Sequence, residues 1–289
     1  MSGLLSREEF NLLTKIHQQV RFDEPVAIVP NTLYDQCVEK GYIVGDVLSE
    51  AGYAALAPYK VQRAILVAAG FGSRMSPITI NTPKPLVRVH GKRIIESILD
   101  AILAAGIEEI YIVRGYLGEQ FDQLLHQYPM ITFIDNPLYD KGNNILSLRA
   151  AGNLIAGSYI FDSDILIKEP RLITPYQYES HYVGLPVEDT DDWCLTSKNG
   201  CITSMVRGGK NCHLMFGFSY WTPEDGQALA KDIDEVCGWK GGTDKYWDEV
   251  AIDCFSDHYC LHITDCAEGD IVEIDSYEEL CMMDPVYKI

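Results

Sequence analysis

The chain of 289 residues is 47% hydrophobic and 22% charged, so it can bury a sizeable core and is not disordered. With 23 Lys and Arg against 42 Asp and Glu, its formal net charge is −19, which argues against nucleic acid or an anionic membrane as a main partner. The start of the sequence lacks a signal-peptide pattern, and no apolar stretch approaches the roughly 18 residues that span a bilayer.

The nine cysteines form no Cys-x-x-Cys pair. In a chain of this size they predict free, mostly buried thiols and a cytoplasmic location. Five Cys and His residues lie close together near the end of the chain, but their spacing matches no common zinc finger, so we expect packed thiols and ordinary strand histidines. These residues are Cys254, His258, Cys260, His262 and Cys266.

Residues 1–60 are predicted to form one small helical unit. A capping-box-like start at 6–9 begins an apolar helical pattern. A second helix is expected at about 31–40 and a third at about 45–56, with a strand at 41–44 between them. This order suggests a winged-helix-like module. Because the segment holds five basic and eight acidic residues, we expect it to serve interaction or dimerisation rather than DNA binding.

Residues 61–289 change to alternating strands and helices, which indicates an α/β domain. The continuous apolar run at 64–69 is typical of a buried parallel strand. The alternation implies right-handed crossovers and a mostly parallel sheet, whose ligands bind beyond the carboxyl ends of the strands. The expected elements are strands at 64–69, 109–113, 131–134 and 158–161 and helices at 94–105, 117–127 and 144–155.

The loop after the first of these strands carries the strongest chemical signal. Gly70 and Gly72 let backbone N–H groups approach an anion, while Arg74 and Lys84 add positive charge. Prolines on both sides of Lys84 fix its backbone. The loop lacks the third glycine of the dinucleotide motif and the Gly-Lys-Ser/Thr of a Walker P-loop. We therefore predict a phosphate-binding loop of another type.

This loop resembles the signature of nucleoside-triphosphate-dependent nucleotidyltransferases, which include the sugar-1-phosphate nucleotidylyltransferases. The matching motifs are Gly-x-Gly-Ser-Arg at 70–74, Pro-x-Thr at 77–79 and Pro-Lys-Pro at 83–85. The resemblance implies a Rossmann-like α/β/α domain that transfers a nucleotide from an NTP to a phosphorylated acceptor and releases pyrophosphate. It also implies that Arg74 and Lys84 are catalytic and hold the triphosphate. The nucleotide-binding residues that it implies are Ala69, Gly70, Gly72, Ser73, Arg74, Lys84, Gly115, Tyr116, Asn136, Asn143 and Asn144.

Later segments narrow the resemblance to the small bacterial cytidylyltransferases that act on phosphocholine. They read Asn-Pro-Leu-Tyr at 136–139, Asn-Asn-Ile-Leu-Ser-Leu at 143–148 and Glu-Ile-Asp-Ser-Tyr-Glu-Glu-Leu at 273–280. The resemblance covers about residues 62–284 and implies CTP and phosphocholine as substrates and CDP-choline as product. It departs at Gly142, where a Thr is expected, and over 185–215, so it defines the acceptor less well than the reaction.

Two acidic strand ends are candidates for a metal site. Asp164 follows the strand at 158–161, and Asp275 follows a strand at 271–274. Mg²⁺ prefers carboxylates together with phosphate oxygens, and the resemblance implies both residues as its ligands. We therefore predict Mg²⁺ at Asp164 and Asp275, with Asp162 as the next candidate for the first ligand. The structural alternatives are a strand-end turn for Asp164 and a helix N-cap for Asp275.

The acceptor pocket is expected in the second half of the chain. The quaternary ammonium of choline has no N–H donor and is best bound by aromatic faces. The acidic neighbours Asp191, Asp192, Asp248 and Glu249 are expected to add long-range attraction. The residues predicted to bind the acceptor are Trp193, Tyr220, Tyr246 and Trp247, with the carboxylates Asp192 and Glu249.

Several alternatives stay open. The same chemistry on 2-aminoethylphosphonate or phosphoethanolamine would favour carboxylate and carbonyl acceptors over an aromatic box. A sugar 1-phosphate is less favoured, because residues 185–289 offer no obvious large sugar-binding insertion. A DNA-bound nucleotide sensor is disfavoured by the acidity. The sequence also leaves open a homodimer and a natural chain that continues past Ile289 into a second enzyme.

Overall fold

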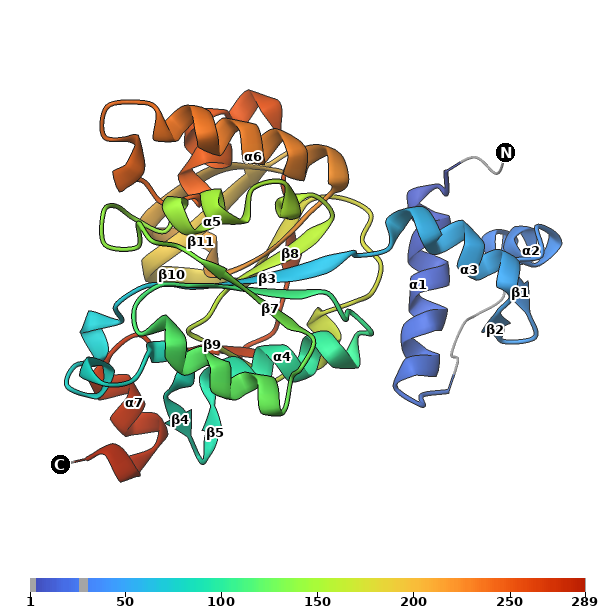
Figure 1. Cartoon of the computed structure of the whole chain (residues 1–289). Helices are drawn as coiled ribbons and strands as arrows, with labels where there is room; N and C mark the ends of the chain where they lie inside the picture. Colours follow the sequence, from blue (N-terminus) through green and yellow to red (C-terminus); the bar gives the residue numbers. More distant parts are fainter. Residues whose placement is uncertain (1–3, 26–30, 289) are drawn as a thin grey trace. The chain divides into compact units, whose positions relative to one another are not determined.

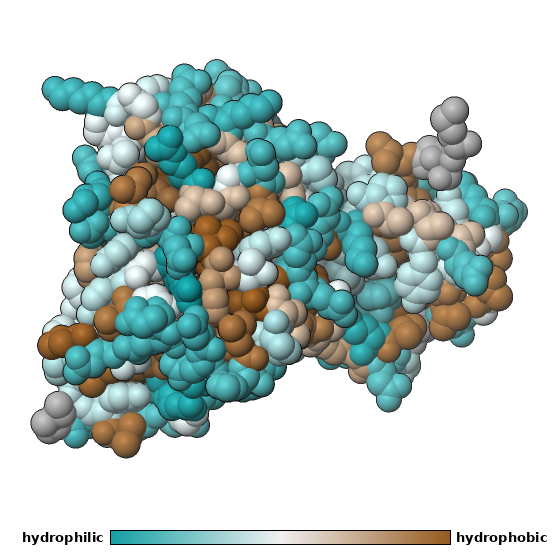
Figure 2. All heavy atoms as spheres, in the orientation of Figure 1, coloured by the Kyte–Doolittle hydropathy of each residue, from teal (hydrophilic) through white to brown (hydrophobic). Residues whose placement is uncertain are grey.

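The computed structural model describes residues 4–25 and 31–288, and the chain divides into two compact units (Figure 1). Unit 1 comprises Met1–Val61 and Thr174–Tyr178, and unit 2 comprises Gln62–Ile173 and Glu179–Ile289. Hydrophilic residues cover much of the visible surface of both units, in keeping with the strong net charge (Figure 2). Within the described ranges, no helix is long and apolar enough to cross a membrane.

Unit 1 is built from three helices and a short hairpin. The helices are α1 (Arg7–Arg21), α2 (Thr32–Glu39) and α3 (Glu50–Leu56), and the hairpin pairs β1 (Ile43–Val44) with β2 (Val47–Leu48). As expected from the sequence, α1 begins with a capping box made by Ser6 and Glu9. The hairpin precedes α3, whereas a wing would follow the third helix. The described part of unit 1 therefore does not confirm a winged helix.

Tyrosines from much later in the chain complete unit 1. Tyr178 stacks on Tyr59 with ring centroids 5.3 Å apart, and it also contacts Phe10 at 5.2 Å. The backbone N–H of Gln177 donates to the Tyr59 carbonyl. The segment Thr174–Tyr178 thus supplies part of the small unit's core, a return of the chain that the sequence pattern did not predict.

A seven-stranded sheet forms the centre of unit 2, in the order β12-β10-β11-β8-β3-β6-β7. The strands β8, β3, β6 and β7 are parallel to one another, and β11 is antiparallel to both of its neighbours. Helix α4 covers one face, and α5 and α6 cover the other (Figure 1). This arrangement confirms the predicted α/β/α fold with a mostly parallel sheet. The bounds are β3 (Arg63–Ala68), β6 (Ile110–Arg114), β7 (Ile131–Asp135), β8 (Ser158–Asp162), β10 (His181–Lys198), β11 (Cys201–Trp221), β12 (His262–Asp265), α4 (Ile94–Ala104), α5 (Ile145–Ala151) and α6 (Pro223–Cys237).

Short elements outside the central sheet position the expected metal ligands. Strand β9 (Ile165–Ile167) pairs antiparallel with β13 (Ile271–Glu273), so two segments more than 100 residues apart run side by side. The backbone N–H of Ile274 donates to the Asp164 carbonyl over 3.1 Å. Two further elements, the hairpin of β4 (Arg88–Val89) with β5 (Lys92–Arg93) and helix α7 (Tyr277–Met283), complete the unit. The predicted helix at 117–127 is a 3₁₀ helix over Gly118–His126.

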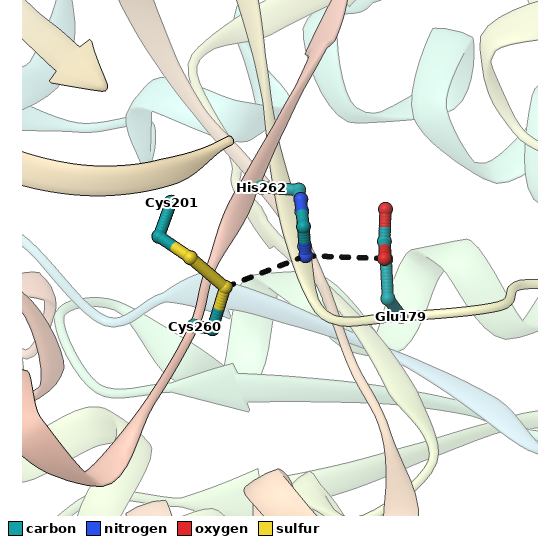
Figure 3. The surroundings of a disulfide bond; sticks show 4 residues. All are labelled: Glu179, Cys201, Cys260 and His262. Atoms are coloured by element: carbon teal, nitrogen blue, oxygen red, sulfur yellow. Dashed lines mark hydrogen bonds and ion pairs between the residues drawn. A yellow bond between two sulfur atoms is a disulfide. The ribbon is translucent and has the colours of Figure 1, made fainter. Parts of the chain in front are cut away.

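The prediction of free thiols is wrong for one pair of cysteines. Cys201 and Cys260 form a disulfide that joins the start of β11 to the residues before β12 (Figure 3). These segments run side by side, because the Ile202 N–H donates to the Leu261 carbonyl over 2.7 Å. The His262 ring lies between the disulfide and Glu179, with its Nε2 3.6 Å from the Cys260 Sγ and 3.1 Å from a Glu179 oxygen. Cys260 is therefore a disulfide partner here. The free thiols are Cys37, Cys194, Cys212, Cys237, Cys254, Cys266 and Cys281.

Candidate active site

The glycine-rich loop begins where β3 ends and packs closely against the lysine segment. Gly72 has a φ of +61°, a backbone conformation that favours glycine, and it caps a 3₁₀ helix over Ser73–Met75. A Cβ atom at Gly72 would lie 2.8 Å from the Cβ of Lys84. The Thr79 hydroxyl donates to the Gly72 carbonyl over 2.9 Å. Because Gly72 has no side chain, the loop can pack directly against Lys84.

Lys84 lies at the centre of a charged cluster. Its side chain is 10% exposed, and its Nζ donates to Asp164 Oδ2 over 2.9 Å and to Asp275 Oδ1 over 2.7 Å. Arg74 reaches the second oxygen of Asp275 at 2.7 Å. Burial alone would lower the pKa of Lys84, but the negative charges of Asp164 and Asp275 outweigh it and raise the pKa. The lysine is therefore a fixed positive charge at neutral pH.

A third carboxylate joins the two predicted metal ligands. Oxygens of Asp164, Glu273 and Asp275 all lie within 4.8 Å of one another. Burial, followed by the charges of Asp164 and Asp275, raises the pKa of Glu273 to about 9. Glu273 was quoted in the Glu-Ile-Asp motif but not assigned to the site. Alternation along β13 would have been the available signal, since it places Glu273 and Asp275 on the same face.

These groups open into one cavity of about 570 Å³. It is lined by the glycine-rich loop and Lys84, by residues of β10 and β11, and by Tyr246 and Asp248. Of the predicted nucleotide-binding residues, seven line it: Gly70, Gly72, Ser73, Arg74, Lys84, Asn143 and Asn144. The cavity is therefore located beyond the carboxyl ends of β3 and β8, as the sheet topology predicts.

Four predicted nucleotide-binding residues do not line the cavity. Ala69 and Asn136 are buried, and the Asn136 amide donates to the Ser147 hydroxyl over 3.2 Å. Tyr116 donates its backbone N–H to the Ala69 carbonyl and its hydroxyl to the Ile80 carbonyl. A Cβ atom at Gly115 would lie 2.6 Å from the Cβ of Tyr139. These four residues hold the surrounding loops instead.

The predicted aromatic box is only half present. Trp193 and Tyr246 line the cavity together with Asp192, and the two rings meet edge to face at 5.7 Å. Tyr220 is 2% exposed and packs on Tyr159, because this part of β11 is paired on both edges within the sheet core. Trp247 is fully buried against Tyr182 and Trp221. The assignment of Tyr220 and Trp247 to the pocket is therefore wrong.

Glu249, also predicted to bind the acceptor, pairs with Lys245 over 2.9 Å and does not line the cavity. Its neighbour Asp248 does line it. Asp248 is 4% exposed and accepts a hydrogen bond from the Tyr182 hydroxyl over 2.9 Å. Burial raises the pKa of Asp248 to about 7, although the Tyr182 hydrogen bond acts in the opposite direction. From the sequence, Asp248 was predicted only to attract the acceptor over a long range.

Two further lining residues were missed or ranked second. Asp162, at the end of β8, lines the cavity, and burial followed by the charge of Asp164 raises its pKa well above the usual range. Its place two residues before Asp164 was the available signal. Arg207 brings a third cation to the cavity from β11. It lies within the divergent stretch 185–215, where no motif pointed to it.

Comparison with known proteins places this site in a family. The profile of the nucleotidyl transferase family matches residues 63–170. The 2-aminoethylphosphonate cytidylyltransferase of Lancefieldella rimae is 34% identical, over 78% of this chain and 92% of its own length. The choline-phosphate cytidylyltransferase of Streptococcus pneumoniae is 28% identical, over 78% of this chain and 98% of its own.

A solved structure shows the same architecture. The CTP:phosphocholine cytidylyltransferase from Streptococcus pneumoniae superposes with a TM-score of 0.72 at 28% identity, covering 79% of this chain and all of the other. The resemblance predicted from the loop motifs is thus confirmed by sequence and by fold. The chain belongs to the nucleotidyl transferase family, and its cavity is the candidate active site of a nucleotidyltransferase.

Proposed function

We propose that this enzyme is a cytidylyltransferase, which transfers CMP from CTP to a small phosphate or phosphonate that carries an ammonium group. The observation that carries the proposal is the convergence of Lys84, Asp164 and Asp275 beneath the glycine-rich loop, in one cavity with Trp193 and Tyr246. The named relatives that transfer CMP to such acceptors support it. Because CTP is a cytoplasmic metabolite, we place the reaction in the cytoplasm.

The reaction needs little acid–base chemistry from the protein. An acceptor oxygen bonds to the α-phosphorus of CTP, while the bond from that phosphorus to the β-phosphate oxygen breaks and its electron pair leaves with pyrophosphate. The second pKa of a phosphate monoester is about 6, so the nucleophile is already largely deprotonated at neutral pH. Lys84 and Arg74 are positioned to stabilise the negative charge that develops, and the backbone N–H groups at Gly70 and Gly72 to hold phosphate oxygens.

The acidic cluster fits a magnesium ion by its donor chemistry. Asp164, Glu273 and Asp275 present hard carboxylate oxygens that lie close enough to share one ion. Mg²⁺ bound there would neutralise charge on the triphosphate. Lys84 already holds two of these carboxylates in place, so the ligands are oriented before a metal binds. We propose Mg²⁺ as the cofactor on this basis.

A pyrophosphate-release assay tests the function. We expect turnover with CTP, and not with ATP, GTP or UTP, on at least one acceptor among phosphocholine, phosphoethanolamine and 2-aminoethylphosphonate. Excess chelator should abolish turnover, and Mg²⁺ should restore it. Sugar 1-phosphates should be poor acceptors. Turnover of a sugar 1-phosphate, or none with CTP on any amine acceptor, would contradict the proposal.

A further inference from the structure

We propose, resting on the cytidylyltransferase function above, that Asp248 determines acceptor specificity by binding a primary ammonium group, with Asp162 as the second carboxylate of that subsite. The acceptor class that follows is an aminoalkyl phosphonate or phosphate with free N–H donors, rather than one with a trimethylated nitrogen. Neither carboxylate is explained by the transfer chemistry at Lys84.

Asp248 is a positioned carboxylate at the acceptor end of the cavity. It comes two residues after Tyr246, whose ring meets Trp193 on the cavity wall. The Tyr182 hydroxyl donates to its Oδ1, and the Tyr182 ring stacks on the buried Trp247 at 6.0 Å with an interplanar angle of 16°. The Tyr182 hydroxyl and the burial of the residue therefore hold the carboxylate at the cavity wall.

Asp162 lines the same cavity, in space that is free because residue 217 is a glycine. Gly217, on β11, has a φ of +63°, and a Cβ atom there would overlap Asp162 Oδ2. The glycine thus makes the space that the carboxylate occupies. Within the described part of the chain, no donor hydrogen-bonds to Asp162. Its oxygens are available to a ligand.

The cations of the cavity do not neutralise these two carboxylates. Lys84 and Arg74 are committed to Asp164 and Asp275. Among the described residues, no ion pair joins Arg207 to Asp162 or Asp248. Buried carboxylates are normally paired with a cation, because desolvating an isolated charge is costly. A cationic ligand supplies the missing partner, and a CTP triphosphate cannot.

The chemistry of the subsite selects a primary ammonium. Carboxylate oxygens accept N–H hydrogen bonds, and a primary ammonium offers three of them. A trimethylated nitrogen offers none and is bound best by several aromatic faces. The aromatic residues that line the cavity are Trp193, Tyr246 and the largely buried Phe216, whereas Tyr220 and Trp247 are buried elsewhere. Asp248 and Asp162 add carboxylate oxygens that can accept hydrogen bonds from a primary ammonium but not from a trimethylated nitrogen.

The wild-type enzyme alone can test the specificity. We would measure kcat/KM with CTP for phosphoethanolamine and for its N-methyl, N,N-dimethyl and N,N,N-trimethyl derivatives, the last being phosphocholine. Each methyl group removes one N–H donor, so we expect a stepwise fall of about tenfold or more in total. A flat series, or one that rises toward phosphocholine, would overturn the proposal while leaving the cytidylyltransferase function intact.

Variants then assign the effect to Asp248. With Asp248→Asn we expect kcat/KM for 2-aminoethylphosphonate to fall by about 30-fold or more, as for loss of a buried charged hydrogen-bond partner. With propylphosphonate, in which a methyl group replaces the ammonium, the change should stay within about threefold. Asp253→Asn is the matched control, because Asp253 lies five residues away on the exposed side of the same segment. It should leave both acceptors unchanged.

Three results separate the outcomes. An equal loss on both phosphonates in a folded Asp248→Asn protein would show that Asp248 supports the fold or the nucleotide site, and would overturn the proposal. An unchanged preference for 2-aminoethylphosphonate would overturn it as well. If no acceptor releases pyrophosphate from CTP with the wild-type enzyme, the proposed function fails, and the inference fails with it.

Discussion

Lys84 is the residue whose charge links the phosphate loop to the acidic cluster. Its Nζ lies between Asp164 and Asp275, so its removal leaves two carboxylates without their shared cation. We predict that Lys84→Met, which keeps the apolar stem, lowers kcat by about 10²–10³, the usual effect of losing a preorganised charge. Steady-state pyrophosphate release measures this, and a thermal melt shows whether the variant is folded. Near-normal kcat in a folded variant would contradict the role.

His181 should make the protein acid-sensitive. It is 3% exposed, and burial, followed by the charge of His262, lowers its pKa to about 4. An unfolded histidine titrates near 6.5, so the native state binds fewer protons between pH 6.5 and 4. The stability is complete above pH 6.5 and is lost as the pH falls through this window. Between pH 7 and pH 4.5 the loss from this residue is about 2–3 kcal/mol.

The histidine prediction is checked by urea unfolding at pH 7 and at pH 4.5. We expect wild type to lose about 2–3 kcal/mol more than His181→Gln over that interval. The variant also loses packing, which lowers both of its values equally, so only the difference between the two pH values is informative. Identical pH dependence in the two proteins would show that His181 does not titrate with a lowered pKa.

At the level of elements, the sequence predicts what is encoded locally. Strand β3 was recognisable because a buried parallel strand is a continuous apolar run, and Ala64, Ile65 and Leu66 are indeed fully buried. The phosphate loop was recognisable because its glycines, prolines and lysine each have a chemical reason at a fixed spacing. Gly142 replaces the expected Thr because a Cβ atom there would overlap the Thr243 carbonyl oxygen, a contact with a residue far away in the sequence.

The acceptor side was not encoded in the same way. Trp247 and Asp248 are adjacent, yet the first is in the core and the second lines the cavity. Both residues lie outside the strands, so strand alternation could not assign their side chains to the core or to the cavity. The pairing of β10 with β11 includes several register shifts, so simple alternation could not assign the faces of residues 185–215 either. This explains why the reaction was easier to predict than its acceptor.

The disulfide gives a prediction about the edge of the sheet. Cys201 and Cys260 are 59 residues apart, and closing a loop of this size contributes about 4 kcal/mol at most in the chain-entropy model. We expect the oxidised protein to be about 2–4 kcal/mol more stable than the Cys201→Ser, Cys260→Ser double variant in urea. Reduced wild type should match the double variant. Equal unfolding of oxidised and reduced wild type would show that the bond constrains nothing.

In a reducing cytosol this pair would be reduced for most of the time, since glutathione and thioredoxin keep cytosolic thiols reduced. The reduced form should keep the hydrogen bond from the Ile202 N–H to the Leu261 carbonyl, and with it the path of the chain. Kinetic constants of the two forms should therefore be similar, even where their stabilities differ.

The whole molecule combines a catalytic unit with a small second unit, and the two named relatives are shorter than this chain. The two named cytidylyltransferases match 78% of this chain while covering more than nine tenths of themselves. Every residue that lines the candidate active site belongs to unit 2. The catalytic chemistry should therefore survive without residues 1–60. The remaining chain should nevertheless be less stable, because the segment Thr174–Tyr178 would lose the residues of unit 1 against which it packs.

We therefore predict two separate effects of deleting residues 1–60. Tyr178 loses the rings of Phe10 and Tyr59, and Tyr176 loses that of His17, so newly exposed tyrosines should promote association, seen by light scattering. Adding Tyr176→Ser and Tyr178→Ser to the deletion should restore a monodisperse protein. Its kcat/KM for the acceptor should then lie within about threefold of the full chain, because no cavity residue has changed. A monodisperse deletion protein with a much larger loss would instead show that unit 1 takes part in catalysis, which no contact within the described residues of the cavity suggests.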